Sequence, residues 1–205
     1  MKGLLLKDLY MIKKYCRFTV VAALVMVSYS IFFIPTFFLL FYPCFLAGTI
    51  PVILYQWDDE SGWSWYSSTM PYTKGQIVSG KYLIGLGGQF LLLVAIGTVL
   101  ALKAHMAQNE YVSLMILLAC LSLITSSSCL PFMFRFGSKK GSIVYYTMHG
   151  IICGGCIWLA PDLLFEFLFG QVDMVGVLPW MCLIAVGAYA LSWFLSFQAY
   201  RKREF

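Results

Sequence analysis

Charged residues are scarce in this sequence, and they are unevenly placed. Asp, Glu, Lys and Arg make up 11% of the 205 residues, whereas hydrophobic residues make up 61%. Five stretches of 21 to 40 residues contain no charged side chain: Phe18–Trp57, Tyr82–Leu102, Tyr111–Phe134, Gly141–Pro161 and Met174–Tyr200. Soluble domains carry about 25% charged residues. The composition therefore excludes a soluble domain and indicates an integral membrane protein.

The charge-free stretches are long enough to cross a bilayer. A spanning helix needs about 20 apolar residues, so the first stretch accommodates two helices and each of the others accommodates one. Pro35-Thr36 lies near the middle of the first stretch, where a tight turn is expected. We predict an all-α integral membrane protein with a single domain, 1–205. Its six transmembrane helices are expected at about 18–35, 37–56, 82–103, 111–134, 142–160 and 175–198.

Ionisable side chains are nearly missing from the predicted spans. His149 is the exception, although ion-coupled transporters usually carry ionisable groups inside the membrane. This shortage argues against a proton or sodium antiporter. An intramembrane hydrolase is also disfavoured, because no span holds paired carboxylates or a clear nucleophile and base.

One group of residues in the fifth span has ligands suited to copper or zinc. His149, Cys153 and Cys156 stand at i, i+4 and i+7. Gly150 and Gly154 favour the alternative of a helix-packing face built from small residues. No other His lies in a span to complete a site, so we predict no metal site. The seven cysteines lie nearly all inside spans, where they are expected to be small buried hydrophobes and not disulfides.

The basic residues indicate the orientation. Six spans place both termini on one side of the membrane, and 13 of the 14 Lys and Arg residues fall on that side. Only Lys103 falls on the other side. The positive-inside rule therefore predicts that both termini and the long polar loop are cytosolic. The net charge of +5 is then a topology signal, and we expect no nucleic-acid partner.

Two segments outside the spans are expected at the membrane surface. Residues 1–17 show no cleavable signal-peptide pattern and are predicted to form an interfacial amphipathic helix. Its apolar stripe would consist of Leu5, Leu9, Ile12 and Cys16. A plain cytosolic extension of the first span is the alternative. On the outer side, 161–174 is too short to span and too apolar for a free loop, so an interfacial or re-entrant helix fits best.

The polar loop at 58–81 is the main soluble feature of the chain. Its acidic start is expected to cap a helix of about three turns that ends before Pro71. Trp63, Tyr66 and Met70 would share one face of this helix. The alternative is that its aromatic residues are ordinary interfacial anchors. Thr73-Lys-Gly-Gln76 has the form of a capping box and would begin the next helix.

This loop resembles that of small bacterial permeases of the ATP-binding-cassette type-2 exporter class. The resemblance rests on Asp59-Glu60-Ser61-Gly62-Trp63, Tyr66, Thr69-Met70-Pro71, Lys74-x-Gln76-Ile77-Val78 and Lys81-Tyr82. The basic leading helix, the six spans and the apolar segment before the last span are also similar. The resemblance implies that the loop carries a coupling helix that docks on an ATPase subunit. It also implies docking residues, namely Asp59, Glu60, Trp63, Tyr66, Met70, Lys74 and Lys81.

A near match to a phosphate-binding loop occurs at Gly75–Tyr82. Tyr82 stands where the motif requires Ser or Thr to hold magnesium, and no strand precedes it. We therefore expect no nucleotide site and no cofactor in this chain, with ATP and Mg bound by a partner ATPase. We expect the chain not to be an enzyme itself.

The resemblance implies a membrane subunit of a bacterial exporter in the plasma membrane. Two ATPase copies are expected, together with a homodimer or a heterodimer with a sister permease. An apolar path would be lined by Phe32, Phe33, Phe37, Phe38, Tyr42 and Met115. Such walls suit an amphipathic peptide, a peptide antibiotic or a hydrophobic drug. The alternative is a non-transporting immunity or scaffold protein whose 58–81 loop binds a cytosolic partner.

Overall fold

The computed structural model describes residues 2–32, 37–103, 108–159 and 174–202, and these ranges contain helices and no strand. The helices are α1 (Lys2–Tyr15), α2 (Arg17–Phe32), α3 (Phe37–Glu60), α4 (Trp63–Ser68), α5 (Lys74–Lys103), α6 (Gln108–Phe136), α7 (Ser138–Leu159) and α9 (Met174–Arg201). The all-α fold is thus confirmed for the described chain.

Each predicted span coincides with one long helix, in chain order α2, α3, α5, α6, α7 and α9. Within the described ranges, three helical stretches are long and apolar enough to cross a membrane by length and composition: Lys74–Ala101, Val112–Phe136 and Leu178–Arg201. The stretch Arg17–Tyr29 is apolar but shorter. That all six of these long helices cross the membrane stays a prediction. The expected turn at Pro35-Thr36 and most of the outer segment 161–174 lie outside the described residues.

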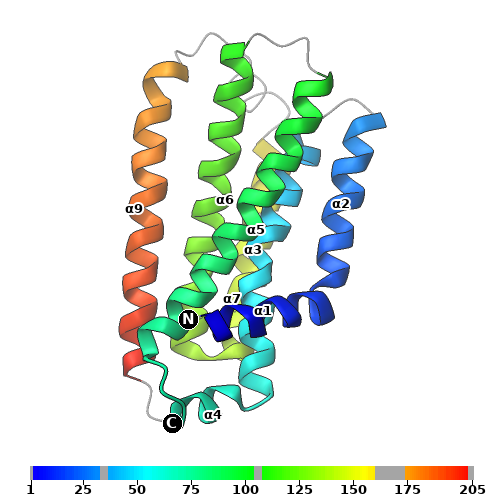
Figure 1. Ribbon diagram of the computed structural model, residues 1–205. Helices are drawn as coiled ribbons and strands as arrows, with labels where there is room; N and C mark the ends of the chain where they lie inside the picture. Colours follow the sequence, from blue (N-terminus) through cyan, green and yellow to red (C-terminus); the bar gives the residue numbers. More distant parts are fainter. Residues whose placement is uncertain (1, 33–36, 104–107, 160–173, 203–205) are drawn as a thin grey trace.

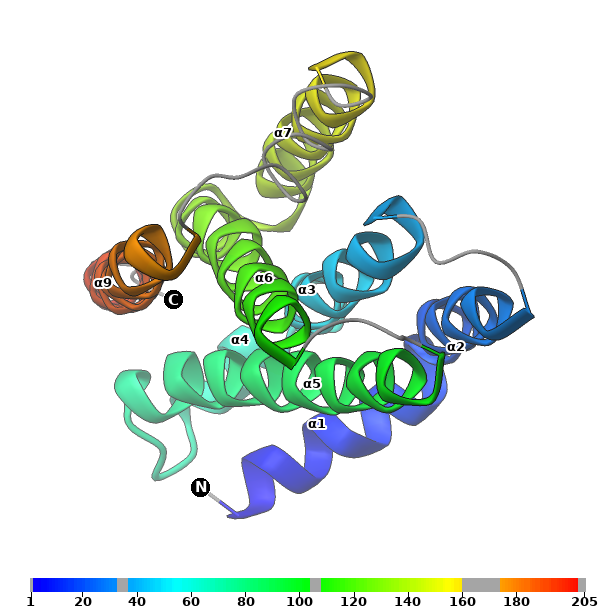
Figure 2. The ribbon, with the colours of Figure 1, turned by 90° about the horizontal axis from the view of Figure 1, so that it is seen from above.

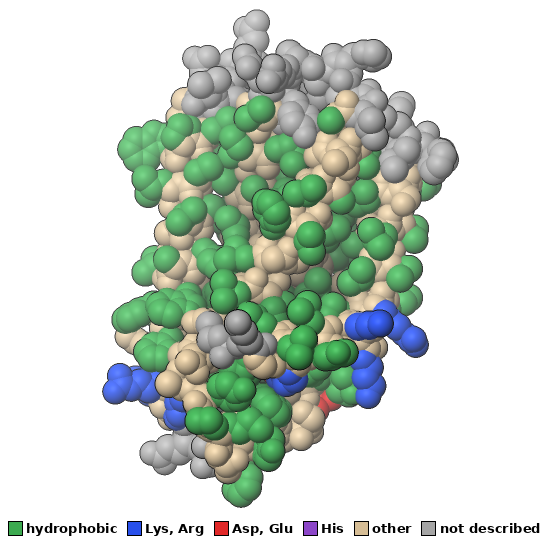
Figure 3. Space-filling model, viewed as in Figure 1, with side chains coloured by type: hydrophobic (Ala, Val, Ile, Leu, Met, Phe, Trp, Pro, Cys, Tyr) green, Lys and Arg blue, Asp and Glu red, His purple; other side chains and the backbone are tan. Residues whose placement is uncertain are grey.

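The long helices run roughly side by side, and α1 lies across one end of the bundle (Figures 1 and 2). Helix α6 packs against α3, α5, α7 and α9, and α3 packs against α2, α5, α6 and α7. Helix α4, the start of α1 and the last turn of α9 lie at the end that α1 crosses. Lys and Arg side chains gather there in Figure 3, while hydrophobic side chains cover the middle of that face. We call this end of the bundle, where α1 and α4 lie, the basic end.

The largest cluster of buried side chains lies toward the basic end. It draws residues from α1, α3, α5, α6, α7 and α9, including Leu4, Tyr55, Val78, Met133, Tyr145 and Tyr200. Burial of these apolar surfaces is what holds helices distant in the sequence together. Trp63 of α4 packs against the same cluster. The short polar helix is therefore fastened to the part of the bundle where most helices meet.

The predicted helix at the start of the chain is confirmed as α1. Its buried side was expected to be the apolar stripe, but it also includes a charged residue. Leu5, Leu9 and Ile12 line an apolar cavity of about 530 Å³ that also borders α2, α3 and α5. Leu9 remains largely exposed, whereas the carboxylate residue Asp8 is buried. The apolar stripe alone therefore does not describe how α1 packs.

Candidate functional site

The segment between α3 and α5 differs from its predicted form at its start. Helix α3 continues through Glu60, so the acidic residues end α3 and do not cap α4. Gly62 is the N-cap of α4, with a φ of 72° that favours glycine and with no side-chain cap bond. Helix α4 is six residues long, not the expected three turns. Extending the long, packed helix α3 by these residues is favoured over nucleating a new helix at them, because propagation costs less than nucleation.

The predicted start of the next helix is confirmed. The amide of Thr73 donates to the Gln76 side-chain oxygen at 3.2 Å, and the amide of Gln76 donates to the Thr73 hydroxyl at 3.3 Å. This reciprocal pair is a capping box, and it begins α5 at Lys74. Residues 75–82 are helical within α5, so the near match to a phosphate-binding loop does not form a loop.

Four charged side chains from three helices form a closed ring beneath α1. We call Lys7, Asp8, Asp58 and Lys81 the charge ring. Lys7 Nζ lies 2.7 Å from Asp58 Oδ1 and 3.2 Å from Asp8 Oδ1. Lys81 Nζ lies 2.9 Å from Asp8 Oδ1 and 2.6 Å from Asp58 Oδ2. Each charge therefore has two partners of opposite sign, and the ring is neutral as a whole.

Three of the four side chains in the charge ring are buried, and the Lys7 side chain is 22% exposed. Asp8 and Lys81 are each 2% exposed, and Asp58 is 5% exposed. Removing isolated charges from water is costly, but alternating signs with short contacts offset much of that cost. Asp58 lies in the last turn of α3, where the helix dipole disfavours an acid, and the two lysines compensate for that dipole. The ring joins α1, α3 and α5 at the point from which α4 departs.

Lys7 connects the charge ring to α4. Its ammonium group lies 4.3 Å from the centroid of the Trp63 ring, which is a cation–π contact. Trp63 also packs against Tyr66 with ring centroids 5.6 Å apart. A displacement of α4 would therefore act on Lys7 directly, and through it on Asp58.

The outward side of the 57–70 segment is aromatic. Trp65 is 69% exposed and Tyr66 is 56% exposed, and Glu60 is exposed beside them. Trp63 and Met70 are half-buried. The docking residues predicted from the sequence do not include Trp65, although it is more exposed than Trp63 and Tyr66. The sequence did indicate that Trp65 and Trp63 lie on different sides of α4, because residues two positions apart in a helix do not face each other.

Two further predicted contact residues are engaged within the chain. Asp59 accepts a hydrogen bond of 3.0 Å from the amide of Ser138, the first residue of α7, where a carboxylate is favoured. Lys74 donates at 3.2 Å to the carbonyl of Arg201, the last residue of α9. Lys81 is inside the charge ring. The structure thus places Asp59, Lys74 and Lys81 as links between helices, and leaves Glu60 and Tyr66 on the surface.

Cys16 lies next to the charge ring at the junction of α1 and α2. It is fully buried with Ile50, Leu54 and Ile84. Burial raises the pKa of the Cys16 thiol to about 11, and the nearby positive charge of Lys81 opposes this rise only in part. The thiol is therefore protonated near neutral pH.

The other predicted site residues lie away from this region. Tyr42 and Met115 pack against one buried cluster in the half of the bundle far from the basic end. The side chains of Phe32, Phe33, Phe37 and Phe38 lie outside the described part. His149, Cys153 and Cys156 lie on α7, and their side chains are also outside that part. Among the described residues, no group of three potential ligands could hold a metal ion.

The sequence matches the family model described as ABC-2 family transporter protein, over residues 3–201. The match covers nearly the whole chain, so the protein belongs to this family of membrane transporters. No curated protein and no solved structure matches the chain.

Proposed function

We propose that this member of the ABC-2 transporter family is the permease subunit of a bacterial exporter, and that a separate ATPase subunit docks on α4. The observation that carries the proposal is the two-sided character of α4. Trp65 and Tyr66 are exposed on its outward side, while Trp63 is fastened inward through Lys7 to the charge ring. Exposed aromatic residues are common energetic centres of protein interfaces.

In this proposal all six long helices span the plasma membrane and the basic end is cytosolic. The gathering of Lys and Arg at that end supports the orientation. ATP and Mg belong to the partner ATPase, two copies of which act with a homodimer of this chain or with a heterodimer that includes a sister permease. The apolar outer segment at 161–174 would cap the opposite side.

The charge ring suggests how motion would be transmitted. When the ATPase pair closes, a push on α4 reaches Trp63 and then Lys7. Lys7 is paired with Asp58 on α3, and Asp58 is paired with Lys81 on α5. Because these contacts are short and largely shielded from water, α1, α3 and α5 would move together instead of one at a time. Tilting of α3 and α5 would open a central path outward.

The proposed cargo is an amphipathic peptide, a peptide antibiotic or a hydrophobic drug. Support comes from the apolar surroundings of Tyr42 and Met115, which pack against a cluster of buried hydrophobic side chains. An ion or a sugar would need polar or charged partners along the path.

A pull-down from gently solubilised membranes tests the proposal. Tagged wild-type protein is expected to bring down an ATPase, and Glu60→Arg with Trp65→Ala is expected to lose it. Trp180→Ala is the matched control, because Trp180 on α9 is 69% exposed, as is Trp65. If the wild type brings down no ATPase in several detergents, the exporter proposal fails. The protein would then be better explained as an immunity or scaffold protein that binds another cytosolic partner.

A further inference from the structure

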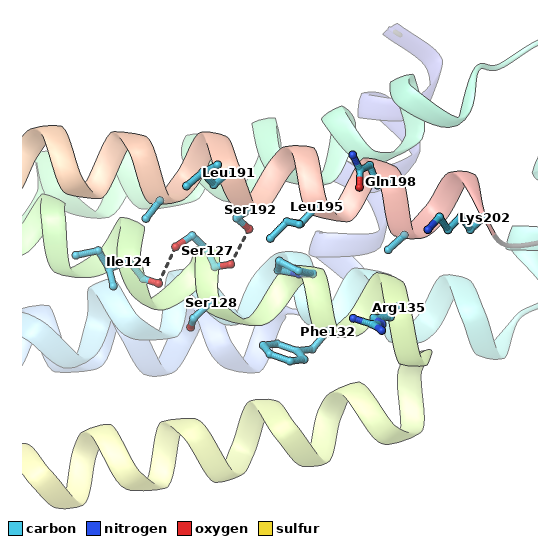
Figure 4. A pocket seen from close by; sticks show the side chains of 13 residues that line it. Ile124, Ser127, Ser128, Phe132, Arg135, Leu191, Ser192, Leu195, Gln198 and Lys202 are labelled. Carbon is cyan, nitrogen blue, oxygen red and sulfur yellow. Dashed lines mark hydrogen bonds between the residues drawn. The ribbon is translucent and has the colours of Figure 1, made fainter.

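A groove of about 760 Å³ runs between α6 and α9, apart from α4 and the charge ring. Its walls include Phe132, Leu191 and Leu195. Figure 4 shows Arg135 of α6 and Lys202, just beyond α9, at the same end of this groove. The volume lies within the range of about 300–1,000 Å³ typical of small-molecule sites.

The serines along the groove do not make its walls hydrophilic. Ser127 donates to the carbonyl of Ile124 at 2.9 Å, and Ser128 donates to the carbonyl of Thr125 at 2.9 Å. Ser192 donates across the helix pair to the carbonyl of Ser127 at 2.6 Å. Each of these hydroxyl hydrogens already has an acceptor. A hydrocarbon chain could therefore lie against these walls without leaving a serine hydroxyl group that lacks a hydrogen-bond acceptor.

The basic end of the groove carries positive charge. All the ion pairs found in the described part of the chain belong to the charge ring, and none involves Arg135 or Lys202. The Arg135 guanidinium lies 5.4 Å from the Phe136 ring centroid, a contact that brings no opposite charge. Gln198 lines the same end and can add an amide donor.

We propose that this groove binds an anionic glycerophospholipid of the inner leaflet. An acyl chain lies along the walls between α6 and α9, and the phosphate lies between Arg135 and Lys202. Basic pockets between membrane helices on the cytosolic side are suited to such headgroups. Only the choice of leaflet rests on the proposed orientation. The lipid chemistry rests on the groove itself.

A second copy of this chain is a poorer occupant on grounds of charge. Among the described acidic residues of the basic end, Asp8 and Asp58 are used in the charge ring and Asp59 binds the start of α7. Glu60 is the remaining described carboxylate there. The described part of a second copy would thus bring mainly positive charge to this end, whereas a lipid phosphate is complementary to both Arg135 and Lys202.

Native mass spectrometry of the detergent-purified protein tests this site. The probes are 1-palmitoyl-2-oleoyl phosphatidylglycerol and the matching phosphatidylcholine. We expect wild type to retain the phosphatidylglycerol about tenfold more tightly, and Arg135→Gln with Lys202→Gln to lose this preference. The control, Lys139→Gln with Lys140→Gln, removes the same charge from exposed residues at the start of α7 and should keep the preference.

A variant of the apolar wall separates chain binding from headgroup binding. Ala188→Phe adds bulk inside the groove and should weaken retention of both lipids. Equal binding of the two lipids to wild type would overturn the proposal, as would equal losses in the two charge variants. A disulfide between copies that carry Leu195→Cys would mean that a second chain covers the groove, and would overturn it too.

Discussion

Lys81 Nζ lies 2.6 Å from Asp58 Oδ2, and both side chains are almost completely buried. The contact joins the end of α3 to the eighth residue of α5, on either side of the α4 segment. An exposed pair of this kind would contribute little. A buried pair that forms part of a neutral ring instead links two helices through a contact that is costly to break.

Lys81→Met should destabilise the protein strongly. The substitution leaves Asp8 and Asp58 with Lys7 as their only partner in the ring, and breaking a buried pair in this way costs about 3–5 kcal/mol. A lower thermal unfolding temperature, followed by tryptophan fluorescence in detergent, is the expected result. Lys139→Met, at an exposed lysine, should leave that temperature unchanged.

Adding Asp8→Asn to Lys81→Met should recover much of the loss. The double variant restores neutrality and keeps the 2.7 Å contact between Lys7 and Asp58. A double variant less stable than Lys81→Met alone would contradict the view that the ring acts as one electrostatic unit.

Trp63 and Trp65 should respond differently to replacement by alanine. Trp63 is half-buried and lies under the Lys7 ammonium group, so Trp63→Ala removes packing and a cation–π contact worth about 0.5–2 kcal/mol. Trp65 is exposed, so Trp65→Ala should leave thermal unfolding unchanged and reduce ATPase capture. Measuring the melting temperature and the amount of ATPase pulled down for both variants tests this difference. Equal melting shifts would mean that α4 is not fastened through Trp63.

Cys16 should react slowly with N-ethylmaleimide in the folded protein. Its pKa of about 11, against an ordinary 9.0, gives about a hundredfold less thiolate near pH 7. The rate should rise with pH until the pH approaches 11, because the thiolate is the reactive form. Peptide mapping by mass spectrometry measures the rate without removing other cysteines.

Asp58→Asn should accelerate Cys16 modification, because it loosens the junction that buries this thiol. Cys44 is the internal control, since it is buried in a different cluster away from the charge ring. A parallel rise at Cys44 would indicate general unfolding and not local opening.

Gly141→Ala should be far more costly than Gly150→Ala on the same helix. A Cβ at Gly141 would stand 2.6 Å from Met133 Sδ and 2.8 Å from Met133 Cα, so α6 and α7 would have to separate. Overpacking of this kind costs about 1–3 kcal/mol. At Gly150 no described heavy atom lies within 4 Å of the added carbon. The thermal unfolding temperatures of the two variants test this prediction. Equal temperatures would contradict the close approach of α7 to α6 at Gly141.

Features that depend on residues close together in the sequence could be predicted, whereas contacts between distant helices could not. The Thr73–Gln76 capping box was predictable because both bonds link residues three apart. The acidic residues before α4 were misplaced because capping preference is weak compared with the packing of α3. Nothing local marked Asp8 as buried. Its partner Lys81 lies on a different helix, and the contact exists only once α1 crosses the bundle.

The sequence by itself determined the helical class, the positions of the long helices and the basic character of one end. These follow from local composition, since long apolar stretches must satisfy their backbone hydrogen bonds internally and charges must remain near water. Only the tertiary structure decided that four of those charges would pair as a ring with three of them buried, and that Trp65 would be more exposed than Trp63. The physical reason is that a buried charge depends on short contacts with partners from other helices, and packing alone brings those partners together.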